Sequence, residues 1–545
     1  FTVFKHNPND DNSLLSNSIY DIKQMKDGKI WICTNMGGVS ILDLQHNAFI
    51  SAEEIDFQNI KATNDNYGLS SPNARCAYQD CYGNIWIGNY RGGIDFISHT
   101  QPMFNILPYT IETAKGLSYK QVWGMWATDN QVWLGSEDEL GLFINGKKIK
   151  TYDLYSHELV YNTHINTIYE DRQKRLWLGT YKNGILLYKP DKQEIVHISS
   201  SLFNNLDVRC FYEDQNGKMW IGTETGIYSC TNEVLVKEEE IQKQLPDIMV
   251  HSLLRDKEGK LWVGTFGKGI SIFDVNNKLL WNFVIENGFC SNAVNHMIKD
   301  SEEQIWVATR EGLAVFKNTS QPNRYKIFKE KEGLENSHIR AICEDLEKRI
   351  WISSNDGISC LDPKQNLFYN YNHHDGVPMG DFMNGSTCMT HNGIIYFGSQ
   401  NGACFFNPKE LSSIRQVSPV KITQFCKYNK KTESKDAEIS IPFKKGVVHL
   451  PYNQNSFRIT FNVLDYTQSP QVEFTYMLEG LENRWYDTQG ENQVIFRNIP
   501  PGKYNFKVRT RIRNQEWDKE IASLNIFIAP PLWLTWYAKL GYVIL

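Results

Sequence analysis

Aromatic and basic side chains recur at two kinds of position in this chain: just before an apolar segment, and just after a short segment built around Trp. Aromatic rings stack on the apolar faces of sugars, and Arg and Lys bind carboxylate or sulfate groups. Arg, Lys and His are frequent at these positions although the net charge of the chain is −5. Their frequency there favours an anionic oligosaccharide as the ligand. The predicted ligand-binding residues are Tyr90, Arg91, Trp123, Trp126, His164, Tyr181, Lys182, Arg209, His251, Phe266, Lys268, His296, Arg310, His338 and Arg340.

Recurring carboxylates suggest a second chemistry, because glycoside hydrolysis generally needs two carboxyl groups on opposite sides of the sugar. Here six Asp residues each stand six positions before a Trp, in turns such as Asp214-Gln215-Asn216-Gly217. Asp in such a turn commonly caps the hairpin. We therefore predict no catalytic residues and no enzymatic activity for this chain, and keep a propeller glycoside hydrolase or lyase acting on a polysaccharide as the alternative.

The sequence predicts neither a cofactor nor a metal site. The Gly-Gly pairs join strand to strand and do not lead from a strand into a helix, as a phosphate-binding loop would. Eleven cysteines are scattered singly between Cys33 and Cys426, and we interpret them as small buried hydrophobic residues rather than metal ligands or disulfides. The net charge and a pI of about 6.3 give no indication of a nucleic-acid partner.

An internal repeat must position the candidate residues. A Trp flanked by apolar residues recurs nine times, with Tyr396 in the last copy; the first interval is 55 residues and the others are 42–47. Each unit is interpreted as strand, tight turn, Trp strand, polar loop, third strand and outer strand. The Trp strands are apolar on both faces, as in Leu261-Trp262-Val263, which indicates blades that are covered on both sides.

The predicted fold class is all-β: a seven-bladed β-propeller plus part of a second propeller, followed by an Ig-like β-sandwich. Residues 1–105 are assigned to the last blades of an incomplete N-terminal propeller and 106–410 to the seven-bladed propeller, because the last seven units are the regular ones. A single ring of eight or nine blades is the alternative.

The repeat stops after Asn407-Pro408, and alternating strands such as Phe457–Val463 follow. Residues 416–529 are therefore predicted to form an Ig-like sandwich. Residues 530–545 contain two Trp and two Tyr beside a rising apolar run, which is typical of an interfacial belt at the start of a transmembrane helix. A frayed terminal strand is the alternative for this segment.

These features resemble a known family. Blades of the form Asp-x-x-Gly-Lys-Met/Leu-Trp-Ile/Val-Gly-Thr resemble the two-component-regulator propeller repeat, and Phe405-Phe406-Asn407-Pro408 resembles its closing blade. Phe474–Trp485, with Pro501-Gly502-Lys503-Tyr504, resembles the three-tyrosine domain that follows such propellers. The resemblance covers nearly the whole chain.

The resemblance implies the periplasmic sensor region of an inner-membrane hybrid two-component regulator, of the kind that polysaccharide-degrading gut bacteria use. The expected ligand is then an oligosaccharide, the expected assembly is a homodimer, and the membrane is reached through the C-terminal helix. Histidine kinase activity and transcription regulation would belong to the full-length protein. Such receptors usually carry two seven-bladed propellers, and this chain departs from that pattern by lacking most of the first.

Overall fold

The computed structural model describes residues 3–43, 56–62, 68–98, 103–107, 110–113, 116–119, 121–137, 139–154, 164–198, 206–411, 419–427, 437–439, 447–464, 472–512, 517–534, 537–538 and 544. Nearly all regular structure in these residues is β-strand. The chain divides into two compact units: residues Met103–Ile414, and residues Phe1–Pro102 together with Arg415–Leu545.

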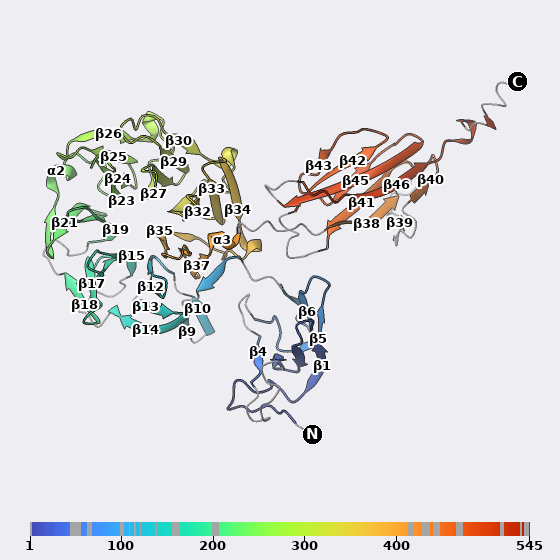
Figure 1. Cartoon of the computed structure of the whole chain (residues 1–545), viewed down its shortest axis with the longest axis horizontal. Coiled ribbons are helices and arrows are strands. Elements are labelled where there is room, and N and C mark those ends of the chain that lie inside the picture. The colour runs from blue at the N-terminus through green and yellow to red at the C-terminus, as the bar shows by residue number, and fades with distance from the viewer. Residues whose placement is uncertain are drawn as a thin grey trace. The chain divides into compact units, whose positions relative to one another are not determined.

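The unit Met103–Ile414 is a ring of seven four-stranded antiparallel sheets, or blades, with the first strand of each blade toward the axis (Figure 1). Consecutive strands pair in order within a blade because each is joined to the next by a short turn. The first three blades are β11 (Gly124–Ala127), β12 (Gln131–Gly135), β13 (Glu139–Ile144) and β14 (Lys147–Asp153); β15 (Ile165–Glu170), β16 (Leu176–Thr180), β17 (Ile185–Lys189) and β18 (Glu194–Ile198); and β19 (Val208–Glu213), β20 (Met219–Thr223), β21 (Gly226–Thr231) and β22 (Val234–Lys237).

Blades four to seven complete the ring. They are β23 (Val250–Arg255), β24 (Leu261–Thr265), β25 (Ile270–Phe273) and β26 (Leu279–Phe283); β27 (Val294–Lys299), β28 (Ile305–Thr309), β29 (Gly312–Phe316) and β30 (Lys326–Phe328); β31 (Ile339–Glu344), β32 (Ile350–Ser354), β33 (Ile358–Asp362) and β34 (Leu367–Tyr371); and β35 (Phe382–Met389), β36 (Ile395–Ser399), β37 (Gly402–Phe406) and β8 (Asn105–Leu107). Two short helices, α2 (Glu239–Gln242) and α3 (Pro408–Leu411), and the 3-10 turns η3 (Ile285–Asn287), η4 (Glu330–Glu332) and η5 (His373–Asp375) connect the strands. A two-stranded sheet of β9 (Thr110–Thr113) and β10 (Gly116–Tyr119) precedes blade one.

The ring is closed by strand exchange between its two ends. β8, which begins the unit, is the outer strand of blade seven and pairs with β37. Blade seven also bonds to blade one: the Val122 N–H donates to the Ser399 carbonyl at 3.0 Å, and the Ser386 hydroxyl donates to the Val122 carbonyl at 3.2 Å. Residues some 260 positions apart in sequence are thus tied together, which closes the ring.

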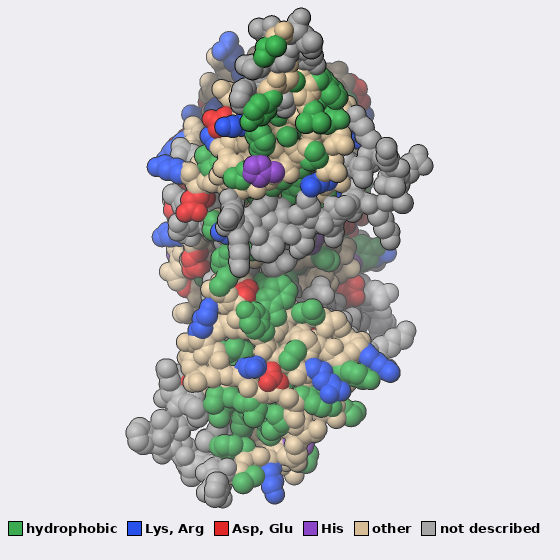
Figure 2. Space-filling view, turned by 90° about the vertical axis from the view of Figure 1, so that its right-hand side faces the viewer, with side chains coloured by type: hydrophobic (Ala, Val, Ile, Leu, Met, Phe, Trp, Pro, Cys, Tyr) green, Lys and Arg blue, Asp and Glu red, His purple; other side chains and the backbone are tan. Residues whose placement is uncertain are grey.

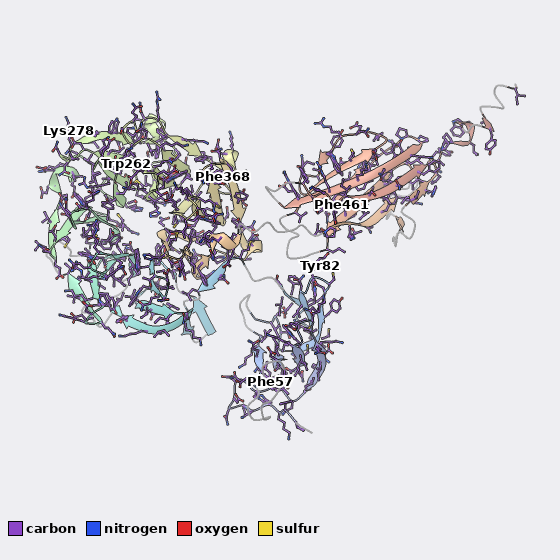
Figure 3. The ribbon with its side chains drawn as sticks, viewed as in Figure 1. Phe57, Tyr82, Trp262, Lys278, Phe368 and Phe461 are labelled. Carbon is purple, nitrogen blue, oxygen red and sulfur yellow. The ribbon has the colours of Figure 1, made fainter. Side chains whose placement is uncertain are left out.

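A buried Trp–Asp pair recurs in the blades. In blades two to six, Trp177, Trp220, Trp262, Trp306 and Trp351 are at most 3% exposed. Each indole Nε1 donates to the carboxylate of the Asp six residues earlier, at 2.8–3.0 Å. The predicted burial of the repeat Trp is confirmed, and Trp262 can be seen within its blade in Figure 3, inside the rim marked by Lys278.

The same carboxylate also organises the turn between the first two strands. One oxygen of Asp256 accepts from the backbone N–H groups of Glu258 and Lys260, both at 2.9 Å, and the other accepts from Trp262 at 3.0 Å. Hydrogen bonds to a carboxylate are stronger than those between neutral groups. The recurring Asp therefore fixes the hairpin and the indole together, as the capping interpretation predicts.

Two further sheets lie in residues 19–97. They consist of β1 (Ile19–Gln24), β2 (Ile30–Thr34), β3 (Gly38–Leu42) and β4 (Gln58–Ile60), and of β5 (Ala74–Gln79), β6 (Ile85–Asn89) and β7 (Ile94–Ile97). Trp86 repeats the bond to Asp80 at 3.1 Å. Trp31 has Met25 six residues earlier, and its buried indole nitrogen has no hydrogen-bond partner among the described residues.

The residues after 419 form a sandwich of two sheets. One has the order β39 (Ala437–Ile439), β38 (Val420–Lys427), β41 (Phe457–Val463) and β44 (Gln493–Phe496). The other has the order β40 (Val447–Leu450), β46 (Ala522–Ile528), β45 (Gly502–Ile512), β42 (Val472–Glu479) and β43 (Tyr486–Asp487). Strand β41 alternates buried and half-buried residues, and Phe461 packs against Phe474 and Phe506 of the facing sheet, which makes the core (Figure 3).

Half of the segment 530–545, predicted to be the start of a transmembrane helix, lies outside the described residues. Within it, Leu532–Leu534 form the 3-10 turn η7. Among the residues that the structure describes, no helix is both long and apolar enough to cross a bilayer.

Charged side chains of both signs are scattered over the face drawn in Figure 2.

The Asp–Trp pair makes a direct stability prediction. Asp256→Ala removes the acceptor of one indole and two backbone N–H groups, so we expect the free energy of unfolding to fall by about 2–4 kcal/mol. Urea unfolding followed by Trp fluorescence measures the change.

Asp274→Ala is the matched control for this experiment. Asp274 caps the outer hairpin of the same blade through Asn276 and Lys278, at 2.9 and 2.8 Å, but no indole donates to it. We expect Asp274→Ala to lower the free energy of unfolding clearly less than Asp256→Ala does. Equal losses in the two variants would show that the indole bond contributes nothing beyond the cap.

Candidate ligand-binding site

One end of the ring gathers the loops that precede each first strand and follow each second strand. A backbone hydrogen bond joins the two loops in most blades: Tyr181 N–H to His164 C=O, Glu224 to Asp207, Phe266 to Met249, Arg310 to Ala293 and Gln400 to Asp381, at 2.9–3.2 Å. We call this end of the ring the inlet face. Most of the predicted binding residues lie on it, because the repeat places them at the same two positions in every blade.

An aromatic stack begins the inlet face at blades one and two. The rings of Trp123 and His164 lie 5.5 Å apart, and those of His164 and Tyr181 lie 4.7 Å apart and nearly parallel at 6°. The Lys182 ammonium lies 4.8 Å from the Tyr181 ring centre. The indole nitrogen of Trp123 is buried without a hydrogen-bond partner among the described residues.

Two carboxylates share one guanidinium at blade three. The Arg209 Nη2 group lies 2.7 Å from Asp207 Oδ2 and 2.6 Å from Glu224 Oε1. Asn166 of blade two donates to the other oxygen of Asp207 at 2.6 Å. Burial raises the pKa of Asp207 to about 7 against the attraction of Arg209, with Glu224 adding to the rise. Burial also opposes ionisation of Glu224, but the hydrogen bonds from Arg209 and Asp207 outweigh it and lower the pKa of Glu224.

Blades four to six contribute a cation held on an aromatic ring. The Arg310 guanidinium lies 4.5 Å from the centre of the Phe266 ring, and His251 packs 5.1 Å from the same ring. Burial, followed by the charge of Arg209, lowers the pKa of His251 to about 4. Burial, followed by Arg340 and Arg310, lowers the pKa of His338. Both imidazoles are therefore neutral hydrogen-bonding groups at neutral pH, and no carboxylate of the described residues forms an ion pair with Arg310.

A second Arg bridges blades six and seven. Arg340 donates to Asn355 at 2.7 Å, to Asn384 at 3.1 Å and to Asp381 at 3.3 Å. Close by, the Nε2 of His338 is buried with no partner among the described residues. Arg209 Nε shares this property, so the inlet face presents hydrogen-bonding groups whose capacity the described chain does not use.

Besides Arg209 and Arg340, whose ion pairs are described above, five predicted residues lie elsewhere or are already engaged. Tyr90 and Arg91 lie in the other compact unit, where Arg91 and Arg75 approach the Tyr90 ring. Trp126 lies within β11 and packs near Tyr169 of the next blade, so it is not a loop residue. Lys268 pairs with Glu286 at 3.8 Å.

The fifth, His296, lies within β27, and its Nδ1 accepts from the Ile342 N–H of the next blade at 3.2 Å. Its role is therefore at least partly to join two blades.

Sequence reasoning missed the acceptors of the inlet face, namely Asp207, Glu224, Asn355, Asp381 and Asn384. Asp207 and Glu224 occupy the same two repeat positions as the basic and aromatic residues that were chosen. A prediction that took every residue at these two repeat positions would have included Asp207 and Glu224. Asn384 lies in an irregular part of β35, which no repeat predicts.

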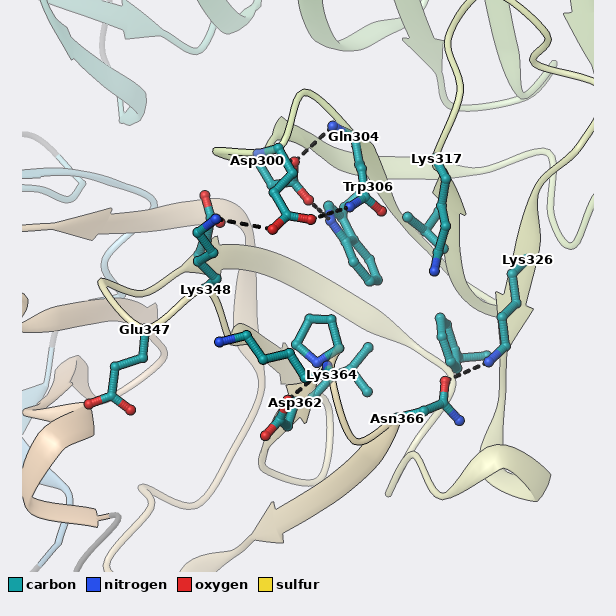
Figure 4. Close-up of a pocket in the computed structure, with 16 residues that line it drawn as sticks. Asp300, Gln304, Trp306, Lys317, Lys326, Glu347, Lys348, Asp362, Lys364 and Asn366 are labelled. Atoms are coloured by element: carbon teal, nitrogen blue, oxygen red, sulfur yellow. Dashed lines mark hydrogen bonds and ion pairs between the residues drawn. The ribbon is translucent and has the colours of Figure 1, made fainter.

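The opposite end of the ring carries the hairpin turns and an interblade cavity of about 130 Å³ (Figure 4). Among its lining residues, Lys348 forms an ion pair with Glu302 at 3.0 Å, and Asp300 accepts a hydrogen bond from the Trp306 indole at 2.8 Å. All eleven cysteines are free thiols. Among the described residues, no three His, Cys, Asp or Glu side chains are gathered as a metal site would require.

Known families match this architecture. Residues 465–529 match the Y_Y_Y domain, and residues 160–182, 201–225 and 244–267 match the two component regulator propeller. The extracellular domain of the putative hybrid two component system BT3049 from B. thetaiotaomicron is 40% identical, with a TM-score of 0.82, over 94% of this chain and 68% of that chain.

A second B. thetaiotaomicron extracellular domain, from the putative one component system BT4673, is 19% identical with a TM-score of 0.49 over 95% of this chain and 70% of that chain. Histidine kinase P4 from Formosa agariphila is 25% identical over 71% of this chain. The chain spans only about a third of the length of that curated relative. The chain belongs to the family of extracellular sensor domains of hybrid two-component systems.

His296 predicts a pH dependence of stability. Burial lowers its pKa from 6.5 to about 4, so between these values the unfolded chain binds a proton that the folded chain does not. Stability from this group is complete above pH 6.5 and is lost as the pH falls toward 4. Relative to His296→Gln, the wild type should lose roughly 2–3 kcal/mol of unfolding free energy over that range.

Paired urea titrations at pH 7.0, 5.5 and 4.5 measure this difference. A constant gap between wild type and His296→Gln across the three pH values would contradict the assignment of a neutral, partly buried imidazole.

Proposed function

We propose that the inlet face binds a glycan-derived oligosaccharide that carries an anionic group, carboxylate or sulfate. In this proposal the chain is the periplasmic sensor region of a hybrid two-component histidine kinase and response regulator, which signals across the inner membrane as a homodimer and regulates polysaccharide-utilisation genes. The observation that carries the proposal is Arg310, a cation that lies on the Phe266 ring without an ion pair from the described residues.

Three features of the inlet face support an acidic sugar as the ligand. The stack of Trp123, His164 and Tyr181 offers aromatic surface next to a cation. The neutral His251 and His338 supply polar groups without adding charge. Arg310 can bind an anionic substituent through charge-assisted hydrogen bonds. Sugar stacking and anion binding are thus available on one face of the ring.

The Arg310 proposal predicts a selective loss of affinity. Calorimetric titration with a panel of defined neutral, uronate-containing and sulfated oligosaccharides should find an acidic ligand. Arg310→Gln should weaken its binding by about 10–100-fold, the value of a hydrogen bond to a charged group. Arg324→Gln is the matched control, because Arg324 lies in the loop before the outer strand of the same blade. Equal affinity of the two variants would refute the anion site at Arg310.

A glycoside hydrolase or lyase is the second candidate function, and one observation favours it. Asp207 and Glu224 are two carboxyl groups on one guanidinium whose pKa values are moved in opposite directions. Such a divergence is common in acid–base pairs of enzymes. Here, however, Asp207 is 3% exposed and the pair is already held by Arg209 and Asn166, which favours a role in fixing Arg209.

We therefore expect the purified chain to release no product from any oligosaccharide that it binds, even after prolonged incubation. Chromatography with mass detection measures this. Glu224→Gln is the informative variant: product formation by the wild type that this substitution abolishes would replace the sensor proposal with the enzymatic one.

A further inference from the structure

The first strand of blade seven departs from the pattern of the other blades. In blades two to six, the pairing of the first and second strands skips one residue near the inlet face, as between Val294 and His296. In blade seven, Phe382 pairs with Ser399 and the next pair is Thr387 with Phe397. The residues Met383–Ser386 are therefore looped out of the ladder, and we call them the channel bulge. Such bulges re-aim the chain and are frequent beside functional sites.

The channel bulge reaches across the inside of the ring. β35 contacts β27 of blade five although blade six lies between them. Gly385 adopts a left-handed conformation at φ 66°, and a side-chain carbon placed on it would lie 3.7 Å from the His296 ring. On its other side, Ser386 bonds to Val122 of blade one. The bulge thus lies against blades one, five and six, close to the ring axis.

Arg340 holds the channel bulge from blade six. Its Nη1 donates to Asn384 in the bulge, and its Nη2 donates to Asp381 just before it. The ion pair with Asp381 is long at 3.3 Å, and the Asp381 side chain is 44% exposed. Half-exposed ion pairs contribute little stability, and an amide oxygen is a weaker acceptor than an anion.

An anionic group on the inlet face can therefore compete for Arg340. Arg310 directly follows β28 and Arg340 is the second residue of β31, so both lie at the inlet face on the neighbouring blades five and six, and both lower the pKa of His338. A carboxylate or sulfate bound at Arg310 thus lies near a second guanidinium, whose Nη groups donate to one amide and one loosely held carboxylate while its Nε donates to Asn355. Bidentate binding of the anion by the two Nη groups would replace Asn384 and Asp381 and leave Asn355 in place.

We propose that the channel bulge is a ligand-operated latch. In the unbound chain Arg340 holds Asn384 and Asp381, and an anionic ligand group that takes Arg340 releases Met383–Ser386. Because Ser386 and Ser399 flank the closure with blade one, release would loosen the point at which the ring is tied. This inference rests on the proposed anion binding at the inlet face and adds to it the element that responds.

Hydrogen exchange measured by mass spectrometry on the whole chain tests the latch, with sulfate as the probe and chloride at equal ionic strength as the reference. In chloride, Asn384→Ala and Asp381→Asn should each raise exchange of the 383–386 amides by about fivefold, from the loss of one hydrogen bond. Asn370→Ala, which removes an amide on the outer strand of blade six, should leave them unchanged. Sulfate should raise the exchange of the same amides in the wild type. In Asn384→Ala, where the hold is already lost, sulfate should raise their exchange by less than about twofold more.

The outcomes separate the latch from the proposed function. If sulfate protects the loops around Phe266 and Arg310 while the 383–386 amides do not change, the latch is wrong and the anion site stands. If sulfate alters no amide of the inlet face, the anion site is wrong and the latch loses its trigger. If Asn384→Ala exchanges like Asn370→Ala, Arg340 does not hold the bulge and the latch is refuted whatever sulfate does.

Discussion

Each repeat Asp accepts hydrogen bonds from at least three donors, as Asp256 does: an indole nitrogen in the second strand and two backbone N–H groups of the preceding turn. The indole is thereby fixed in the space between neighbouring blades, as Trp262 is against Phe316 of blade five. Packing of a large aromatic ring in this way stabilises the structure by several kcal/mol on the usual scale for buried aromatics. Burial raises the pKa of a carboxyl group, but at Asp80 the hydrogen bonds from Trp86 and Asn84 outweigh it, so its pKa lies below the usual value. The Asp80 carboxylate is therefore kept charged for a structural purpose.

Because stability comes from other parts of the ring, the side chains of the inlet face can vary from blade to blade. Stability resides in the interblade Trp residues and in the turns of the opposite end, while the loops of the inlet face share one backbone hydrogen bond in most blades. Their side chains can therefore differ from blade to blade. Blade two carries His164 and Tyr181, blade three Asp207 and Glu224, and blade six His338 and Asn355. A ring with one repeated frame can thus assemble a site of mixed chemistry.

The repeat could be recognised from the sequence because the residues that define each unit lie close together in the chain. A Trp, an Asp six residues earlier and a Gly after the strand predict the hairpin, and burial of the Trp follows from the apolar residues on both faces. Tyr181, Arg209 and Arg310 followed from the same spacing. Trp126 was misassigned to a loop because its repeat unit, that of Trp133, has Ala127 in place of the turn Asp that marks the register elsewhere.

Other features depend on residues far apart in the sequence. The assignment of β8 to blade seven joins residues 105–107 to 403–405, which no local pattern encodes. The pairing of Arg340 with Asn384 requires a bulge whose length cannot be inferred from alternation. The acceptors that neutralise Arg209 were overlooked because acidic residues were considered only as turn caps or as catalysts.

If the inlet face is the binding site, ligand contacts this face and no other part of the chain. Hydroxyl-radical footprinting with a sulfated oligosaccharide mixture measures this directly, because it reports the solvent exposure of individual side chains. We expect protection of Tyr181, Phe266 and His338, with the turns at 301–304 and 346–349 and the sandwich strands unchanged. Protection confined to those turns or to the sandwich, with Phe266 as reactive as before, would contradict it.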